Sequence, residues 1–273
     1  MKHIHVSRQV KEKALAELLF HEFDGDSPPR GFKTRDLVRF LAVDIIVLFS
    51  IKLLLGLGLF PDVDWYVAAI LASKLVLAAY LIWIIRDFRQ AWPETGAVSG
   101  GRLWGWLAAF AVYGLAYPFL LHFQKYNHLL LEKLYLLFGS TYIPEPQDVM
   151  VLVFEDILSL PLRIVLVTFV ALFGPLLEEL AFRGVGVDAY SRTGGTIFTL
   201  ATTSLLFGLY HFSIQLFLPL SLIGLLFGIA RYLSKTLWCP ILLHCFHNLL
   251  SLATTAQALG LIDFLPFWGV TAE

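Results

Sequence analysis

The segment ILSLPLRIVLVTFVALFGPLLEELAFRG, residues 157–184, decides the fold of this chain. Residues 157–177 are almost entirely apolar, with Arg163 as their one charge. A helix needs about 20 such residues to cross the ~30 Å hydrocarbon core of a bilayer. Three charged residues then follow within the next six positions. The segment therefore predicts a membrane-spanning helix that carries charged side chains within or at the edge of the membrane.

The composition of the whole chain agrees with a membrane protein. Of its 273 residues, 58% are hydrophobic and only 15% are charged, and the mean hydropathy is +0.74. Soluble domains carry about 25% charged residues. The net charge of -1 shows no basic excess of the kind that nucleic-acid binding produces. We expect the lipid bilayer as surroundings and no nucleic-acid partner.

Seven apolar runs predict an all-α fold, a polytopic transmembrane helical bundle of about seven to eight spans. The runs occupy residues 38–60, 65–85, 103–121, 157–177, 196–210, 214–233 and 237–259. An eighth span would come from residues 261–270 or 129–138. We divide the chain into a cytoplasmic N-terminal segment (1–35), N-terminal spans and loops (36–156), a helical core that carries the polar residues (157–260) and an apolar C-terminal tail (261–273).

The distribution of Lys and Arg predicts the orientation in the membrane, because short cytoplasmic loops carry an excess of both. Basic residues precede the first run and recur in alternate connections, whereas the other connections are acidic. This pattern places the N-terminus in the cytoplasm. Charges inside the N-terminal runs, including Asp44 and Lys74, are expected to pair locally or to extend toward the membrane surface.

Two adjacent glutamates are the most specific feature of the decisive segment. Glu179 and Arg183 are four residues apart, so on a helix they share a face and we expect an ion pair. Glu178 is turned by about 100° and has no such local partner. Its apolar surroundings would suit a general base. Pro175 removes a backbone donor and should loosen the helix just before the pair.

Two later helices add imidazole and amide groups. His211 ends one apolar run, and a single histidine there is more often an interfacial residue than a catalytic one. His244 and Asn248 are four apart and therefore lie on one helix face. His247 lies beside them as a third participant or a packing partner.

Together these groups form a plausible hydrolytic constellation, with two mechanisms open. Either His211 and His244 hold a divalent metal such as zinc and Glu178 activates its water, or Glu178 and a histidine activate water directly. Asn248 would then stabilise the oxyanion of the tetrahedral intermediate.

The ordered motifs resemble the CPBP family of intramembrane proteases. They are Glu-Glu-x-x-x-Arg at 178–183, Phe-x-x-x-His at 207–211 and His-x-x-x-Asn at 244–248, and the similarity covers about residues 162–250. That family includes the type II CAAX prenyl endopeptidases and bacterial homologues linked to bacteriocin self-immunity or peptide processing. The resemblance implies that Glu178 activates water, that His211 and His244 assist it, that Asn248 stabilises the oxyanion, and that Glu179 and Arg183 support the site.

The resulting prediction is an endopeptidase of a bacterial cytoplasmic membrane that cleaves a membrane-associated peptide or protein near the cytoplasmic side. The alternative is a non-catalytic membrane protein, either a proton-coupled transporter or an immunity factor that binds its target. A transporter of the inverted-repeat type would show matching interrupted helices in both halves. We see no such repeat in the sequence.

Overall fold

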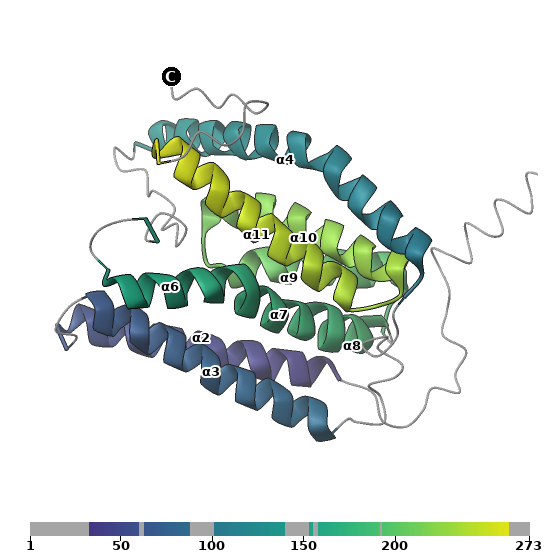
Figure 1. Cartoon of the computed structure of the whole chain (residues 1–273), viewed down its shortest axis with the longest axis horizontal. Coiled ribbons are helices and arrows are strands. Elements are labelled where there is room, and N and C mark those ends of the chain that lie inside the picture. Colours follow the sequence, from purple (N-terminus) through teal and green to yellow (C-terminus); the bar gives the residue numbers. More distant parts are fainter. Residues whose placement is uncertain are drawn as a thin grey trace, which may run out of the picture.

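The computed structural model describes residues 33–59, 63–87, 101–139, 153–154, 158–191 and 193–261. Across these ranges the chain forms helices and no strand, and the helices run lengthwise through one bundle (Figure 1). The all-α prediction is therefore confirmed. The predicted N-terminal segment 1–35 and the apolar tail 261–273, including the possible span 261–270, lie almost wholly outside the described residues.

Seven helical segments make up the described bundle. They are α2 (Thr34–Gly56), α3 (Val63–Asp87), α4 (Leu103–Leu137), an interrupted helix from Leu160 to Ser191, α9 (Thr196–Tyr210), α10 (Ile214–Ser234) and α11 (Trp238–Ala258). The interrupted helix consists of α6 (Leu160–Thr168), the π-helical turn η1 (Phe169–Phe173), α7 (Gly174–Glu179), the π-helical turn η2 (Leu180–Gly186) and α8 (Val187–Ser191). Each predicted apolar run overlaps one of these segments.

Helix α4 is longer than its predicted apolar run of 103–121. It continues without interruption for 35 residues to Leu137, which corresponds to about 52 Å. Residues 129–138 are therefore a continuation of α4 and not a separate helix. The extension mixes leucine with Gln, Lys and Glu. All of these are good helix formers, which explains why the helix outlasts its apolar run.

Four of the described helical segments are long and apolar enough to cross a membrane. They are Asp64–Trp83, Leu103–Leu137, Leu160–Ser191 and Ile214–Ser234. Helix α9 is apolar but has only 15 residues, or about 22 Å of rise, so it ends part-way along the bundle. The count of seven to eight spans stays a prediction.

The packing of α10 fixes the part of the bundle that carries the polar residues. Helix α10 lies along both α9 and α4 and also contacts α11, which in turn contacts α7 and η1. Gly208 allows the close approach of α9 to α10, because a Cβ there would overlap the Ser221 hydroxyl and the Phe217 carbonyl. Phe182, Phe207 and Phe227 are at most 1% exposed and fill the junction.

Candidate active site

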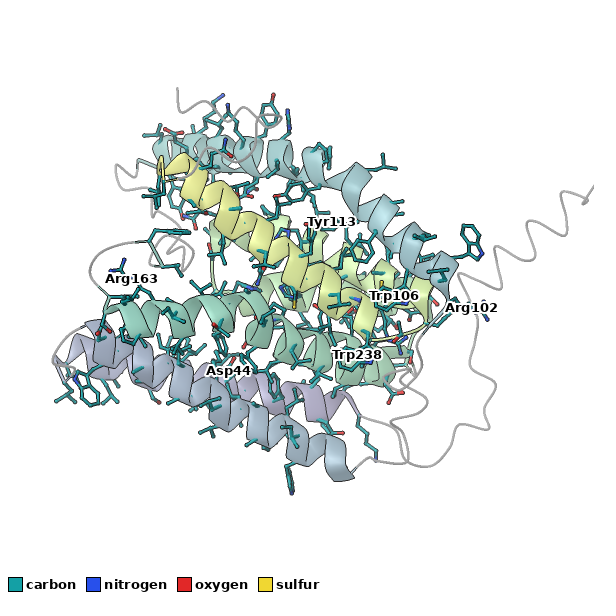
Figure 2. All side chains as sticks on the ribbon, viewed as in Figure 1. Asp44, Arg102, Trp106, Tyr113, Arg163 and Trp238 are labelled. Carbon is teal, nitrogen blue, oxygen red and sulfur yellow. The ribbon has the colours of Figure 1, made fainter. Side chains whose placement is uncertain are left out.

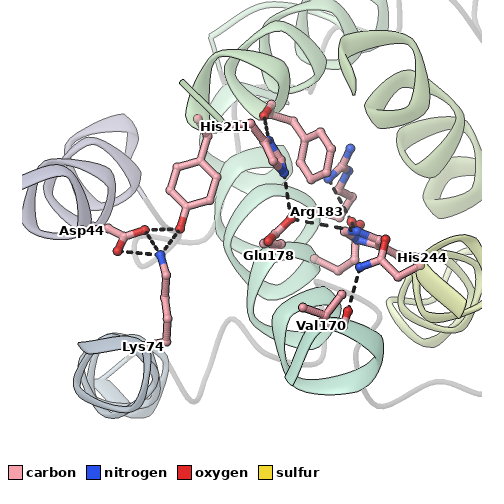
Figure 3. A network of polar contacts seen from close by, with 11 residues as sticks. Asp44, Lys74, Val170, Glu178, Arg183, His211 and His244 are labelled. Atoms are coloured by element: carbon pink, nitrogen blue, oxygen red, sulfur yellow. Dashed lines mark hydrogen bonds and ion pairs between the residues drawn. The ribbon is translucent and has the colours of Figure 1, made fainter. Parts of the chain in front are cut away.

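Three polar side chains from three helices meet at one point. Glu178 on α7, His211 just after α9 and His244 on α11 line one cavity of about 440 Å³. The Oε2 atom of Glu178 lies 3.9 Å from Nε2 of His211 and 4.0 Å from Nε2 of His244 (Figure 3). The structure therefore brings together the residues that the motifs singled out. Their catalytic roles stay predictions.

The distances leave room for a small bridging group. Separations of 3.9 and 4.0 Å are too long for direct hydrogen bonds. The Oε2 atom of Glu178 is buried and has no hydrogen-bond partner among the described residues. A polar contact of this length is the usual place for an intervening water. The site can thus hold one water between the carboxylate and the two imidazoles.

The other ring nitrogens determine what the two Nε2 atoms can do. Nδ1 of His211 lies 2.8 Å from the carbonyl of Phe207, which can only accept, so Nδ1 carries the proton. Nδ1 of His244 lies 2.9 Å from Oε1 of Glu179, a carboxylate paired with Arg183, and it donates in the same way. In the neutral rings both Nε2 lone pairs therefore face Glu178.

The end of α9 holds His211 in place. The helix finishes at Tyr210, and the chain reverses immediately through Phe212, which has a positive φ of 51°. Positive φ is uncommon for a bulky residue. Helix α10 then begins at Ile214, capped by the Ser213 hydroxyl, which accepts from the backbone N–H of Leu216. This tight turn lets His211 face α7 from the end of a short helix.

The expected ion pair between Glu179 and Arg183 is present, and it does more than the spacing indicated. Nη1 of Arg183 donates to Oε1 of Glu179 at 3.0 Å, with both side chains fully buried. The same oxygen accepts from His244. Glu179 thus orients an imidazole of the neighbouring helix, a contact that lies 65 positions away in sequence and that no local spacing could reveal.

Arg183 is enclosed by aromatic rings and by a glycine. Its guanidinium carbon lies 4.7 Å from the centre of the Phe207 ring and 5.6 Å from that of Phe227. Nη2 donates to the carbonyl of Gly224 at 2.6 Å. A Cβ at Gly224 would lie 3.1 Å from that nitrogen and 3.0 Å from a Phe207 ring carbon. The glycine therefore lets α10 approach the buried cation closely.

Asn248 lines the same cavity, and its side-chain amide is anchored by η1. Nδ2 of Asn248 donates to the carbonyl of Val170 at 2.8 Å. Within η1 the N–H of Gly174 bonds to Phe169, five residues earlier. With the same spacing of five residues, the carbonyl of Val170 would accept from the backbone N–H of residue 175. That residue is Pro175, which has no N–H. Asn248 therefore supplies a donor where the helix lacks one, and its second amide hydrogen is available for other use.

His247 is tied to α4 and not to Glu178. Its Nδ1 lies 2.7 Å from the hydroxyl of Tyr113, and its ring packs edge-on against Tyr117. His247 also lines the cavity. Of the two roles left open for it, packing against α4 is the contact that the structure displays.

A second buried polar cluster lies beside the site and contains Asp44 and Lys74, which were expected to pair locally or to extend toward the membrane surface. Nζ of Lys74 on α3 donates to both oxygens of Asp44 on α2, at 2.8 and 2.6 Å, and to the Tyr210 hydroxyl at 2.9 Å. The Tyr210 hydroxyl in turn donates to Asp44 (Figure 3). An ion pair was among the outcomes expected for these two charges. Its link to the residue next to His211 was not, because 136 positions separate Lys74 from Tyr210.

The donor atoms suit zinc in kind but not in spacing. Two imidazole nitrogens and a carboxylate are a ligand set that hydrolytic zinc uses. Neighbouring ligands on tetrahedral zinc lie about 3.3–3.5 Å apart, whereas the separations here are 3.9 and 4.0 Å. No group of three or more His, Cys, Asp or Glu among the described residues is placed to hold a metal ion. The arrangement as it stands does not fit zinc, and the predicted metal role of His211 and His244 stays a prediction.

Comparison with known proteins agrees with the motifs. Residues 160–250 match the family model of the Type II CAAX prenyl endopeptidase Rce1-like proteins. No curated protein and no solved structure matches the chain. The matched segment contains α6 to α10 and α11 as far as residue 250, and with them Glu178, His211, His244 and Asn248. Together with the long apolar helices, this match indicates an integral membrane protein. The match itself supports its assignment as an intramembrane protease of the CAAX type in the CPBP family.

Proposed function

We propose that the protein is an endopeptidase that hydrolyses a peptide bond of a membrane-associated peptide or protein with a water activated by Glu178. The observation that carries the proposal is the convergence of the Nε2 atoms of two imidazoles on the unpartnered, buried Oε2 of Glu178 in a cavity. When both rings are neutral, the two Nε2 atoms and Oε2 of Glu178 are all hydrogen-bond acceptors. A water placed between them can donate a hydrogen bond to two of these three atoms. The proposed setting is a bacterial cytoplasmic membrane.

The first step uses these acceptors in turn. The water donates one hydrogen to Glu178 and the other to the Nε2 atom of His211 or His244, which orients a lone pair toward the substrate carbonyl. As the water oxygen bonds to the carbonyl carbon, Glu178 takes one proton, and the carbonyl π electrons move to the oxygen. General-base help of this kind contributes about 10²–10⁴ in rate.

The second step returns the proton. When the carbon–nitrogen bond breaks, the tetrahedral oxyanion reforms a carbonyl, and protonated Glu178 gives its proton to the leaving amine. The remaining product is a carboxylic acid, whose proton passes to solvent. Glu178 returns to its starting carboxylate, so one water is consumed for each bond cleaved and no other reactant is needed.

Asn248 is the proposed oxyanion partner. Neutral His211 and His244 present acceptors at Nε2 and cannot donate there, so the developing oxyanion needs another donor. The Asn248 amide is held by Val170 through one hydrogen, which leaves the other to donate. A fixed donor of this type is typically worth about 10²–10³ in kcat.

Glu178→Gln tests the proposal, because it keeps the shape of the side chain and removes its basicity. Wild type and variant are expressed at matched membrane abundance, and new peptide termini in the membrane fraction are identified by mass spectrometry. In parallel, purified protein is given two quenched fluorescent peptides, one farnesylated and ending in a Cys-a-a-X sequence, the other an unmodified transmembrane segment. We expect the variant to lose all cleavage that wild type shows.

Glu132→Gln is the matched control, since Glu132 lies on α4 and is absent from the cavity wall. It should cleave like wild type. Equal cleavage by the Glu178 and Glu132 variants would show that the assignment of the base is wrong. If the Glu178 variant keeps the biological effect of the protein while no cleavage is seen with wild type, the non-catalytic alternative, a transporter or an immunity factor, is the better description.

A further inference from the structure

The two ends of the bundle differ in charge. One end, which we call the basic end, is where α2 starts, α3 ends, α4 starts, α8 and α10 end, and α11 starts; the opposite end is the acidic end (Figure 1). Arg102 and Trp238 lie at the basic end and Arg163 at the acidic end (Figure 2). The ends can thus be compared directly with the positions of the cavity residues.

Basic residues concentrate at the first of these ends. Arg102, Arg231 and Lys235 lie close enough that the charges of both arginines, after burial, lower the pKa of Lys235. In the sequence, the segments that connect helices at this end also contain Arg89 and Arg192, and Arg86 stands near the end of α3. The segments that connect helices at the acidic end, residues 57–62 and 138–159, contain no Lys or Arg and five acidic residues. Lys133 and Arg163 lie within helices near the acidic end, as Arg86 and Arg231 do near the basic end. The difference between the two ends therefore lies in the connections.

The cavity is closed toward the basic end. Immediately on that side of Glu178 and His244, the bundle is filled by Phe182, Arg183, Phe227 and Leu243, each fully buried. Arg183 is fixed there by its bonds to Glu179 and Gly224. A peptide or a chain of waters has no passage through this layer of packed side chains.

The cavity extends toward the acidic end. On α11 its lining runs from His244 through Asn248 and Ser251 to Thr255, three residues before the helix ends, a rise of about 16 Å. On α4 it reaches Gln124, which is exposed, whereas His244 at the inner end is 4% exposed. The residues that line the cavity thus change from buried to exposed toward the acidic end.

The outer part of this path is polar enough to be wet. Five polar residues line this part of the cavity: Ser251, Thr254 and Thr255 on α11, Gln124 on α4 and Ser213 in the turn before α10. Polar groups at membrane depth occur where they line a water-filled cavity or are buried in protein. The hydrolytic water needs such a path, because the site lies in a bundle whose outer faces are apolar.

We propose that the cavity opens on the non-cytoplasmic side of the membrane, and that water and the scissile segment enter from there. Short cytoplasmic loops carry the excess of Lys and Arg, which assigns the basic, closed end to the cytoplasm. The substrate is then a membrane-anchored or exported peptide whose cleavage site is presented at the outer face. This differs from the expectation of cleavage near the cytoplasmic side. The part that concerns the substrate rests on the proposed protease function, whereas the direction of opening does not.

Cysteine labelling tests the direction of opening without any substrate. The chain has only two cysteines, Cys239 and Cys245, both buried, so a Cys239→Ala/Cys245→Ala background is simple to make. Single cysteines are then placed as Thr255→Cys and Gln124→Cys in the cavity, and as Arg102→Cys at the basic end. Bacterial cells with an intact inner membrane are treated with a membrane-impermeant maleimide before and after permeabilisation.

We expect Thr255→Cys and Gln124→Cys to react in intact cells, and Arg102→Cys to react only after permeabilisation. Reaction of the two cavity cysteines only after permeabilisation overturns the proposal, and so does failure of both to react in either condition. Gln124 is exposed on α4, so the Gln124→Cys variant reports the direction of opening even if the Thr255 variant does not fold. Failure of the protease assignment is read separately, from the Glu178→Gln cleavage assay.

Discussion

Pro175 and Asn248 should be thermodynamically coupled through the carbonyl of Val170. Asn248→Leu removes the 2.8 Å hydrogen bond and leaves that carbonyl, on a residue only 8% exposed, without its side-chain donor. An orphaned buried carbonyl costs about 1–3 kcal/mol, and hydrogen bonds inside membrane proteins contribute up to about 1.7 kcal/mol. We therefore expect a loss of about 1–2 kcal/mol. For a chain of this size that is a decrease in Tm of about 2–8 °C.

Pro175→Ala offers the missing donor from the helix itself. Alone, it should cost about 0.4–1 kcal/mol by raising the entropy of the unfolded chain. The backbone N–H that this substitution restores stands five residues after Val170, in the register that Gly174 already uses. In this background Asn248→Leu should then cost less than about 0.5 kcal/mol, so the cycle has a coupling energy of about 1 kcal/mol. Pro161→Ala is the control, since the N–H of a residue in the first turn of α6 has no helical partner.

The same set of variants separates the structural role of Asn248 from its proposed catalytic one. Stability is followed by thermal unfolding in detergent, and activity by cleavage of a peptide that wild type accepts. If Asn248 donates to the oxyanion, kcat stays reduced by about 10²–10³ in both backgrounds while Tm recovers only with Pro175→Ala. Recovery of activity along with Tm contradicts the oxyanion role. Equal losses of Tm in the Pro175→Ala and Pro161→Ala backgrounds contradict the hydrogen-bond account.

Three further outcomes follow from the contacts of the buried ion pair and the cavity. Glu179→Gln leaves the fully buried Arg183 without its counter-charge and should cost about 3–5 kcal/mol, read as lower Tm and lower yield of folded protein. Gly224→Ala crowds Arg183 and should cost about 1–3 kcal/mol, whereas Gly114→Ala on α4, where a Cβ meets nothing within 4 Å, should be neutral or slightly stabilising. Purified active protein should contain less than stoichiometric zinc and keep its activity in a chelator. If a chelator removes the activity and added zinc restores it, the proposal that Glu178 and the histidines activate the water without a metal is wrong.

The helices were predictable because each depends on local sequence. The run 196–210 coincides with α9, and most other runs end within a few residues of the observed helix, since apolar character and helix length coincide in a membrane bundle. The pair of Glu179 and Arg183 was predictable for the same reason, being one helical turn apart. The extension of α4 was missed because its apolar pattern fades before its helix propensity does.

Contacts between distant segments could not be obtained in this way. The bond from Asn248 to Val170 depends on a π-helical turn, for which Pro175 is the only sequence signal and does not identify the partner. The cluster of Asp44, Lys74 and Tyr210 joins three helices. Each residue alone is compatible with a membrane-surface position. Only the packing of α2 and α3 beside the end of α9 brings the three together.

The adjacent positions of Glu178 and Glu179 explain why one carboxylate can be structural and the other chemical. A step of one residue turns the side chain by about 100°, which is enough to send Glu179 into the layer of Arg183 and Glu178 into the cavity. The exposures follow: none for the Glu179 side chain and 22% for that of Glu178. Glu179 is held by Arg183 and His244, so its charge is balanced and its position fixed. Because Glu179 then orients His244 toward Oε2 of Glu178, the buried pair builds the environment in which the second carboxylate can bind a water.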